Sequence, residues 1–216
     1  MGHFAVGFAA KAAAPRTSLG TLFAAAQCVD LVWPTFLLLG WEEVKIEPGA
    51  TVVTPLDFAF YPYTHSLTGA AAWAVAAGLV YYAVRRYGRG ALVVGAAVIS
   101  HWFLDLVMHR PDLPLTFTGT TRVGLGLWNS LAGTLIVELG LLAAGVLIYL
   151  RATRARDGVG KWALAGLVGF LLVVYAANVL GPPPASVSMI AWGAQLLWLV
   201  VLWAFWVDRH RGQSPS

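Results

Sequence analysis

Charged residues are scarce in this sequence, and cysteine is almost absent. Only 11% of the 216 residues are charged while 59% are hydrophobic, which gives a mean hydropathy of +0.72. A soluble core does not need so large an apolar share, so the composition excludes a soluble domain and predicts a polytopic membrane protein. Cys28 is the only cysteine, which excludes an intrachain disulfide. The small net charge of +4 lies in loops and argues against nucleic-acid binding.

Long apolar runs are continuous rather than alternating, which predicts α-helices because lipid satisfies no backbone polar group. We therefore expect an all-α membrane bundle that forms one domain over residues 1–216, without an internal repeat. The apolar stretch 2–14 is too short to cross a bilayer and should form a partial helix that ends before Pro15. No basic region precedes it, so it is not a cleavable signal peptide. About six spans are expected, at 19–40, 66–84, 91–109, 125–150, 162–180 and 187–207.

Basic residues mark one face of the expected bundle. By the positive-inside rule this face is cytoplasmic, with both termini on it, which suits the cytoplasmic membrane of a bacterium. The segments 41–65 and 110–124 then lie on the opposite side. The residues that fix this orientation are Lys11, Arg16, Arg85, Arg86, Arg89, Arg151, Arg154, Arg156, Lys161, Arg209 and Arg211.

Ionisable side chains recur at one depth inside the apolar spans. Asp30 is fourteen residues from Arg16, His101 twelve from Arg89, and Glu138 thirteen from Arg151. A rise of about 1.5 Å per residue places each roughly 18 to 21 Å above the basic boundary. His3, thirteen residues before Arg16, reaches a similar level. Ionisable groups are costly in hydrocarbon, so this set predicts a functional site.

The third span carries the most specific pattern. His101, Asp105 and His109 stand at i, i+4 and i+8 and should share one helix face. Imidazoles mixed with carboxylates are the donors that zinc prefers, and manganese or iron also fit a carboxylate-rich site. His65 heads the second span within reach of His109, although a histidine there could also simply cap the helix. A single such histidine could equally make an interhelical hydrogen bond.

Two arginines follow the third span on its outer side. Arg110 and Arg122 could contact an anionic substrate, because the forked donors of arginine suit phosphate. Solvated loop pairs, such as Arg110 with Asp112, are the competing interpretation.

Four short motifs resemble the YdjM-type inner-membrane proteins, a family described as membrane-bound metal-dependent hydrolases. These motifs are Gly2-His3, Val29-Asp30-Leu31-Val32, Thr64-His65-Ser66-Leu67, and Ser100-His101 with Asp105. Their order and spacing fit the family over residues 1 to about 115. The family often has a second aspartate where Val32 stands and a histidine where Trp33 stands, and His109 is an additional imidazole. The resemblance also suggests a distant likeness to zinc-dependent phospholipase C.

Together the residues predict a hydrolase with an intramembrane site. His3, Asp30, His65, His101 and Asp105, with His109, would hold one or two divalent ions that activate water and polarise a phosphoryl or acyl oxygen. Asp30 or Glu138 would accept the proton. A site open to the outer side or to the outer leaflet favours a lipid or lipid-linked phosphoester as substrate, with membrane lipids as neighbours.

Two other classes of protein fit the same residues. A line of acidic and histidine side chains is also typical of a metal-ion or proton transporter, although the cytoplasmic halves of these spans have few polar residues to continue a path. A non-catalytic membrane protein could use the cluster only to lock its helices together.

Overall fold

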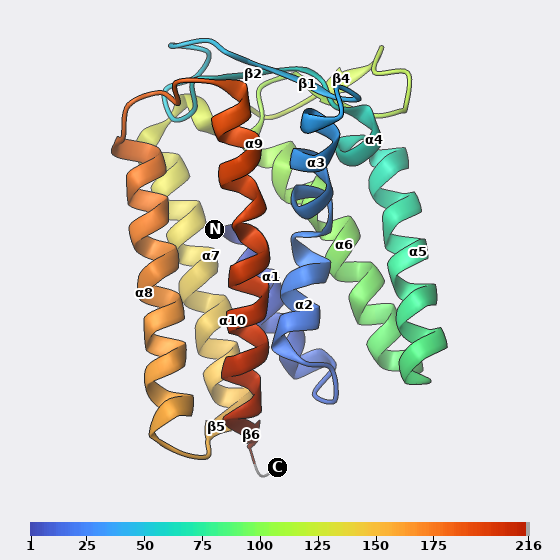
Figure 1. Cartoon of the computed structure of the whole chain (residues 1–216), viewed down its shortest axis with the longest axis vertical. Helices are drawn as coiled ribbons and strands as arrows, with labels where there is room; N and C mark the ends of the chain where they lie inside the picture. The colour runs from blue at the N-terminus through green and yellow to red at the C-terminus, as the bar shows by residue number, and fades with distance from the viewer. Residues whose placement is uncertain (215–216) are drawn as a thin grey trace.

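Long apolar helices make up the protein, which is an all-α bundle as the composition predicts (Figure 1). A computed structural model describes residues 1–214. Five helices are long and apolar enough to cross a membrane by length and composition, or six if the bent pair α2 and α3 forms one span. The helices are α1 (Gly2–Ala13), α2 (Leu19–Ala26), α3 (Cys28–Leu38), α4 (Pro62–His65), α5 (Leu67–Arg85), α6 (Gly88–Met108), α7 (Leu131–Ala152), α8 (Gly158–Leu180), α9 (Val187–Gln195) and α10 (Leu197–Arg209).

Small two-stranded sheets, which the sequence did not predict, lie at both ends of the bundle. Two of them, β1–β2 and β3–β4, lie over the upper end in Figure 1, and β5–β6 lies at the lower end. Each has only two antiparallel strands. The strands are β1 (Glu43–Ile46), β2 (Leu56–Phe60), β3 (Leu113–Pro114), β4 (Arg122–Val123), β5 (Thr153–Ala155) and β6 (Arg211–Gln213), and a short 3-10 helix, η1, covers Leu127–Asn129.

The expected spans agree with the helices except at two places. The span expected at 125–150 begins only at Leu131, because Gly126 adopts a left-handed conformation (φ +74°) and the Ser130 side chain caps the helix by accepting the Gly133 N–H. The last expected span is confirmed as one apolar stretch, Val187–Arg209, although its helical hydrogen bonding is interrupted at Leu196 between α9 and α10. The first span is broken at Gln27, where α2 and α3 meet at 56°.

This break has an identifiable cause at the Ala26 carbonyl. In the described part of the chain no backbone N–H is bonded to this carbonyl, which instead lies 2.8 Å from Nδ1 of His101. A side chain that inserts into the helical hydrogen-bond ladder bends a helix. Pro34 further weakens α3, because proline has no N–H to donate to the carbonyl of Asp30. The bend brings Asp30 into the interior beside α6.

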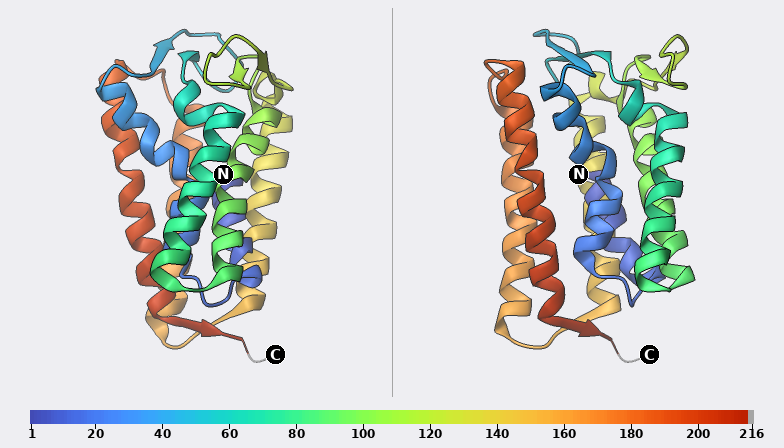
Figure 2. Two further views of the ribbon diagram at one scale, coloured as in Figure 1. Left: turned by 90° about the vertical axis from the view of Figure 1, so that its right-hand side faces the viewer. Right: turned by 45° about the vertical axis from the view of Figure 1, so that its right-hand side comes forward.

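The basic segments gather at one end, as the orientation argument expects. The loops that join α1 to α2, α5 to α6 and α7 to α8 lie at the lower end with β6 (Figures 1 and 2). The first residue, however, lies at mid-height among the helices, and α1 runs from there to the lower end. The partial helix is therefore confirmed, while the side of the membrane that each end faces stays a prediction.

Close backbone packing fixes α1 against α7. A Cβ at Gly145 would lie 2.4 Å from the carbonyl oxygen and 2.7 Å from the Cα of Ala5. Only glycine allows this approach. The neighbouring core is apolar and includes Phe4, Phe8 and Tyr149. Since α1 carries His3, this contact sets the position of that imidazole.

We expect Gly145→Ala to lower the free energy of unfolding by about 1–3 kcal/mol, because the added methyl group meets backbone that cannot rotate away. Gly140→Ala is the matched control on the same helix, since nothing lies within 4 Å of a Cβ there. The control should be neutral or more stable by up to about 1 kcal/mol. Thermal or detergent unfolding of the purified variants checks this, and equal stability of the two would refute the packing argument.

Orientation can be tested by cysteine labelling in a Cys28→Ala background. Val52, which is 64% exposed in the segment between β1 and β2, and Gly158, at the start of α8, lie at opposite ends. An impermeant maleimide should label Val52→Cys but not Gly158→Cys in intact cells, because the basic end is expected inside. The reverse pattern would overturn the predicted orientation.

Candidate metal centre

Five of the predicted ligands converge in the interior of the bundle. His3 comes from α1, Asp30 from α3, His65 from the end of α4, and His101 and Asp105 from α6. They form two overlapping groups that could hold a metal ion, one of His3, His101 and Asp105 and the other of Asp30, His65 and His101. His101 belongs to both groups, so the five side chains make one centre.

Four donor atoms follow one another around a ring. Nε2 of His65 lies 3.2 Å from Oδ1 of Asp30 and 3.9 Å from Oδ2 of Asp105. Nε2 of His101 lies 3.6 Å and 3.3 Å from the same two oxygens. Two ligands bound about 2.0 to 2.2 Å from one ion stand roughly 3 to 3.5 Å apart. Two of the four separations fall in this range, and the other two, 3.6 and 3.9 Å, are longer. The side chains therefore fit an ion in either group of three, with His101 shared between the two groups.

The tautomer of His101 is fixed from outside the ring. Its Nδ1 lies 2.8 Å from the Ala26 carbonyl oxygen, and a carbonyl can only accept a hydrogen bond, so this nitrogen carries the proton. In the neutral imidazole, Nε2 then has a lone pair that faces two carboxylate oxygens. Such an arrangement is stable only with a positive charge in the space, either a second proton on the ring or a metal ion.

His3 occupies the other side of Asp105. Its Nε2 lies 3.2 Å from Oδ1 of Asp105, and its ring stacks on the His101 ring with 3.6 Å between centroids. Nδ1 of His3 is buried and has no hydrogen-bond partner within residues 1–214. Because the two oxygens of Asp105 face different imidazoles, this carboxylate can bridge the two groups.

Access to the centre is uneven. His101, Asp105 and His65 are buried, whereas the Asp30 side chain is 32% exposed. Asp30 is therefore the most exposed member of the centre, and His3, with a side chain 16% exposed, is the next.

His109 is directed elsewhere, although it was predicted to join the ligands. The helix α6 ends at Met108, and the extended backbone of His109 (ψ 144°) turns the residue off the helix face. Its Nδ1 lies 2.9 Å from Oδ1 of Asp112 and 3.3 Å from the Tyr61 hydroxyl. Burial and the nearby Asp112 charge raise the pKa of Tyr61 well above its usual value.

The remaining candidates also lie outside the two groups. Glu138 accepts from the amino group of Met1 at 2.6 Å. Arg110 is paired with Asp57 and Asp112. Arg122 donates to the carbonyls of Gly119 and Ala59 and forms no ion pair in the described part of the chain.

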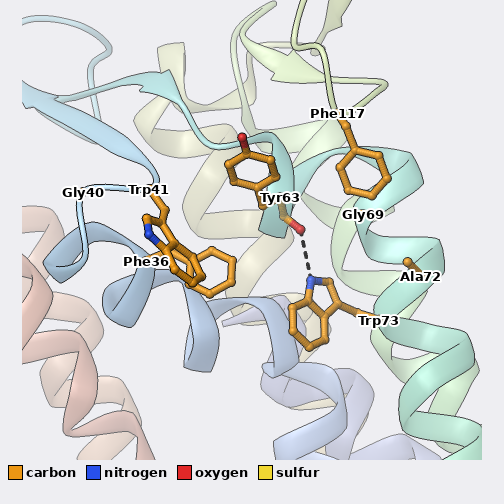
Figure 3. A pocket seen from close by; sticks show the side chains of 8 residues that line it. All are labelled: Phe36, Gly40, Trp41, Tyr63, Gly69, Ala72, Trp73 and Phe117. Atoms are coloured by element: carbon orange, nitrogen blue, oxygen red, sulfur yellow. Dashed lines mark hydrogen bonds between the residues drawn. The ribbon is translucent and has the colours of Figure 1, made fainter.

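An aromatic groove of about 720 Å³ is lined by residues of α3, α4 and α5, among others (Figure 3). It lies between α3 and α5 beneath the β3–β4 segment, and Trp73 donates to the Tyr63 carbonyl at 3.0 Å. Two elements contribute to both sites: α3 supplies Asp30 and a groove residue, and α4 supplies His65 and another. The lining residues are Phe36, Gly40, Trp41, Tyr63, Gly69, Ala72, Trp73 and Phe117.

Two polar residues behind His65 were not predicted to act at the site. Thr64 and Glu42 are both buried, and Thr64 Oγ1 lies 2.7 Å from Nδ1 of His65. Burial raises the pKa of the Glu42 carboxyl, although hydrogen bonds from Thr64 oppose the shift. In the sequence, Glu42 is indistinguishable from the other acidic residues of its loop, while the signal for Thr64 was its place beside His65.

Comparison of the chain with protein-family models, with curated proteins and with solved structures finds no match. The resemblance of the four motifs to the YdjM-type family stays a prediction. The arrangement of the side chains is therefore the basis for an argument about function.

Proposed function

We propose that this protein is a membrane-embedded, metal-dependent hydrolase that acts on a lipid or lipid-linked phosphoester. The observation that carries the proposal is the ring of two imidazole nitrogens and two carboxylate oxygens with Asp30 partly open. A lock between helices needs no exposed member. A reaction centre needs at least one exposed member, because its substrate must reach the reacting atoms.

Zinc is the metal we favour, since two imidazoles and two carboxylates are donors that it accepts, and manganese or iron are alternatives. A divalent ion would balance the charges of Asp30 and Asp105 while both histidines stay neutral. When bound, such an ion supplies Lewis-acid activation of water and of a phosphoryl oxygen.

The residues around the ion then take separate roles. His65, His101 and Asp105 act as buried ligands, and His3 orients Asp105 through its second oxygen. Asp30 is the proton acceptor that substrate water can reach. Glu138, the other acceptor predicted from the sequence, is engaged by the amino group of Met1, so the proposal gives it no catalytic role.

The aromatic groove supports a substrate with a hydrocarbon chain. Its lining is dominated by Phe, Trp and Tyr side chains (Figure 3). It shares α3 and α4 with the metal centre. Arg122 lies in the same β3–β4 segment as the groove residue Phe117 and has no acidic partner among residues 1–214. We assign it the phosphate contact rather than Arg110, whose charge Asp57 and Asp112 already balance.

Metal content tests the centre directly. We expect His101→Ala to lose bound divalent metal, because it removes a donor that belongs to both groups. His109→Ala is the matched control, a buried histidine eight residues further along that belongs to neither group. Elemental analysis of detergent-purified protein, prepared without chelator, gives the result. Metal-free wild-type protein, or equal loss in both variants, would contradict the centre.

Turnover tests the reaction. Zinc-loaded wild-type protein should release phosphate or an alcohol from one member of a panel of lipid and lipid-linked phosphates, and His101→Ala should release none. Arg122→Ala should raise KM more than it lowers kcat, because it removes a binding contact distant from the metal. No turnover of any substrate alongside zinc flux into proteoliposomes would instead identify a transporter.

A further inference from the structure

A chain of short hydrogen bonds runs from the outer loop to the metal centre. Oε1 of Glu42 accepts the backbone N–H groups of Tyr63 at 2.8 Å and Thr64 at 2.9 Å. Oε2 of Glu42 accepts the Thr64 hydroxyl at 2.7 Å. The same hydroxyl oxygen lies 2.7 Å from Nδ1 of His65, whose Nε2 faces Asp30.

The direction of each hydrogen follows from simple counting. A carboxylate can only accept, and Thr64 has one hydroxyl hydrogen, which it donates to Glu42. Towards His65 the hydroxyl oxygen can therefore only accept. Nδ1 of His65 must carry a proton and donate it to Thr64, so in the neutral ring the lone pair is on Nε2.

We propose that Glu42 and Thr64 are positioning residues that hold His65 in the Nδ1–H tautomer and so present its Nε2 lone pair to the metal. The inference rests on the proposed metal centre and deepens it. The Ala26 carbonyl holds His101 in the same tautomer from another element. Both imidazoles of the ring are thus set by hydrogen bonds made on their far side, an arrangement that tunes metal ligands in general.

Glu42 does more than fix the start of α4, because its second oxygen also contacts the Thr64 side chain. One oxygen would suffice to accept the two backbone N–H groups, yet the second oxygen is directed to the Thr64 hydroxyl. Glu42 is only 4% exposed and forms no ion pair in the described chain. Burying an unpaired carboxylate is unfavourable. Burial raises the pKa of Glu42, and its three hydrogen-bond donors oppose that shift and favour the charged form. A charged acceptor at this place sets the direction of the hydrogen-bond relay from Glu42 through Thr64 to His65.

Glu42→Gln should reverse the direction in which hydrogens are donated along this relay, while the side chain at position 42 keeps its shape. The amide oxygen must face the two backbone N–H groups, which leaves the NH₂ group facing Thr64. The Thr64 hydroxyl would then accept from the amide and donate to Nδ1 of His65. His65 would shift to the Nε2–H tautomer, in which the nitrogen that faces the metal has no lone pair.

The experiment compares Thr64→Val, Thr64→Ser and Glu42→Gln with the wild-type protein. Thr64→Val removes the hydroxyl at nearly constant volume, while Thr64→Ser keeps it. Imidazole ¹⁵N spectra of the metal-free, ¹⁵N-histidine-labelled proteins report the tautomer at a pH high enough to keep the rings neutral, with the His65 signals assigned from His65→Ala. Zinc affinity is measured by chelator competition on the folded fraction. The His101 signals serve as the internal reference, because their partner Ala26 is unchanged.

We expect wild-type and Thr64→Ser to show His65 protonated at Nδ1 and to bind zinc alike. Thr64→Val and Glu42→Gln should lose this preference and bind zinc about 10 to 100 times more weakly. An unchanged His65 tautomer and unchanged affinity in both variants would overturn the relay. If Thr64→Val does not fold, the comparison of Glu42→Gln with Thr64→Ser, by His65 tautomer and zinc affinity, tests the relay. Wild-type protein that binds no zinc yet shows the predicted tautomers would refute the proposed centre and leave the relay standing.

Discussion

The positive charge required between His101 and two carboxylates is the constraint on which the rest of the structure depends. The Ala26 carbonyl fixes the proton of His101 on Nδ1, so Nε2 faces Asp30 and Asp105 with a lone pair unless a cation intervenes. Several irregular features serve this arrangement. The break at Gln27 frees the carbonyl, the half-length helix α1 brings in His3, and Gly145 lets that helix approach α7.

The loops at the end opposite the basic segments contact the candidate site and do more than connect spans. Glu42 follows α3 in the chain, and its side chain contacts α4. There it accepts hydrogen bonds from two backbone N–H groups and from the Thr64 hydroxyl. Ion pairs of Arg110 with Asp57 and Asp112 connect β2 to the segment that follows α6 at the same end of the bundle. Apolar helices alone can slide and rotate against one another, because lipid and helix surfaces are similarly apolar. Buried polar contacts at one end therefore give the ligands a fixed register.

Sequence reasoning could predict the height of the ligands but not the direction of each side chain. A constant rise per residue and a basic boundary place His3, Asp30, His101 and Glu138 at one depth, yet Glu138 turns to the amino group of Met1 while the other three converge. The i, i+4 spacing holds for His101 and Asp105 inside α6. It fails for His109, because the helix ends at Met108 and the backbone there is extended. The break at Gln27 depends on a contact with a residue 75 positions away, so no local pattern shows it.

The members of the candidate centre differ in exposure, which distinguishes the proposed reaction centre from a structural lock between helices. A lock gains stability from burying every member of its network, since solvent weakens each ion pair. Here His101 and Asp105 are buried, but the Asp30 side chain remains one-third open (32%). Asp30 is also the residue that the bend at Gln27 carries towards α6, on a helix that lines the aromatic groove as well. The same bend that completes the ring thus places its accessible carboxylate on a helix that a hydrocarbon chain in the groove would touch. This coupling of a candidate ligand and the groove on one bent helix is the feature on which the proposed lipid-directed reaction rests.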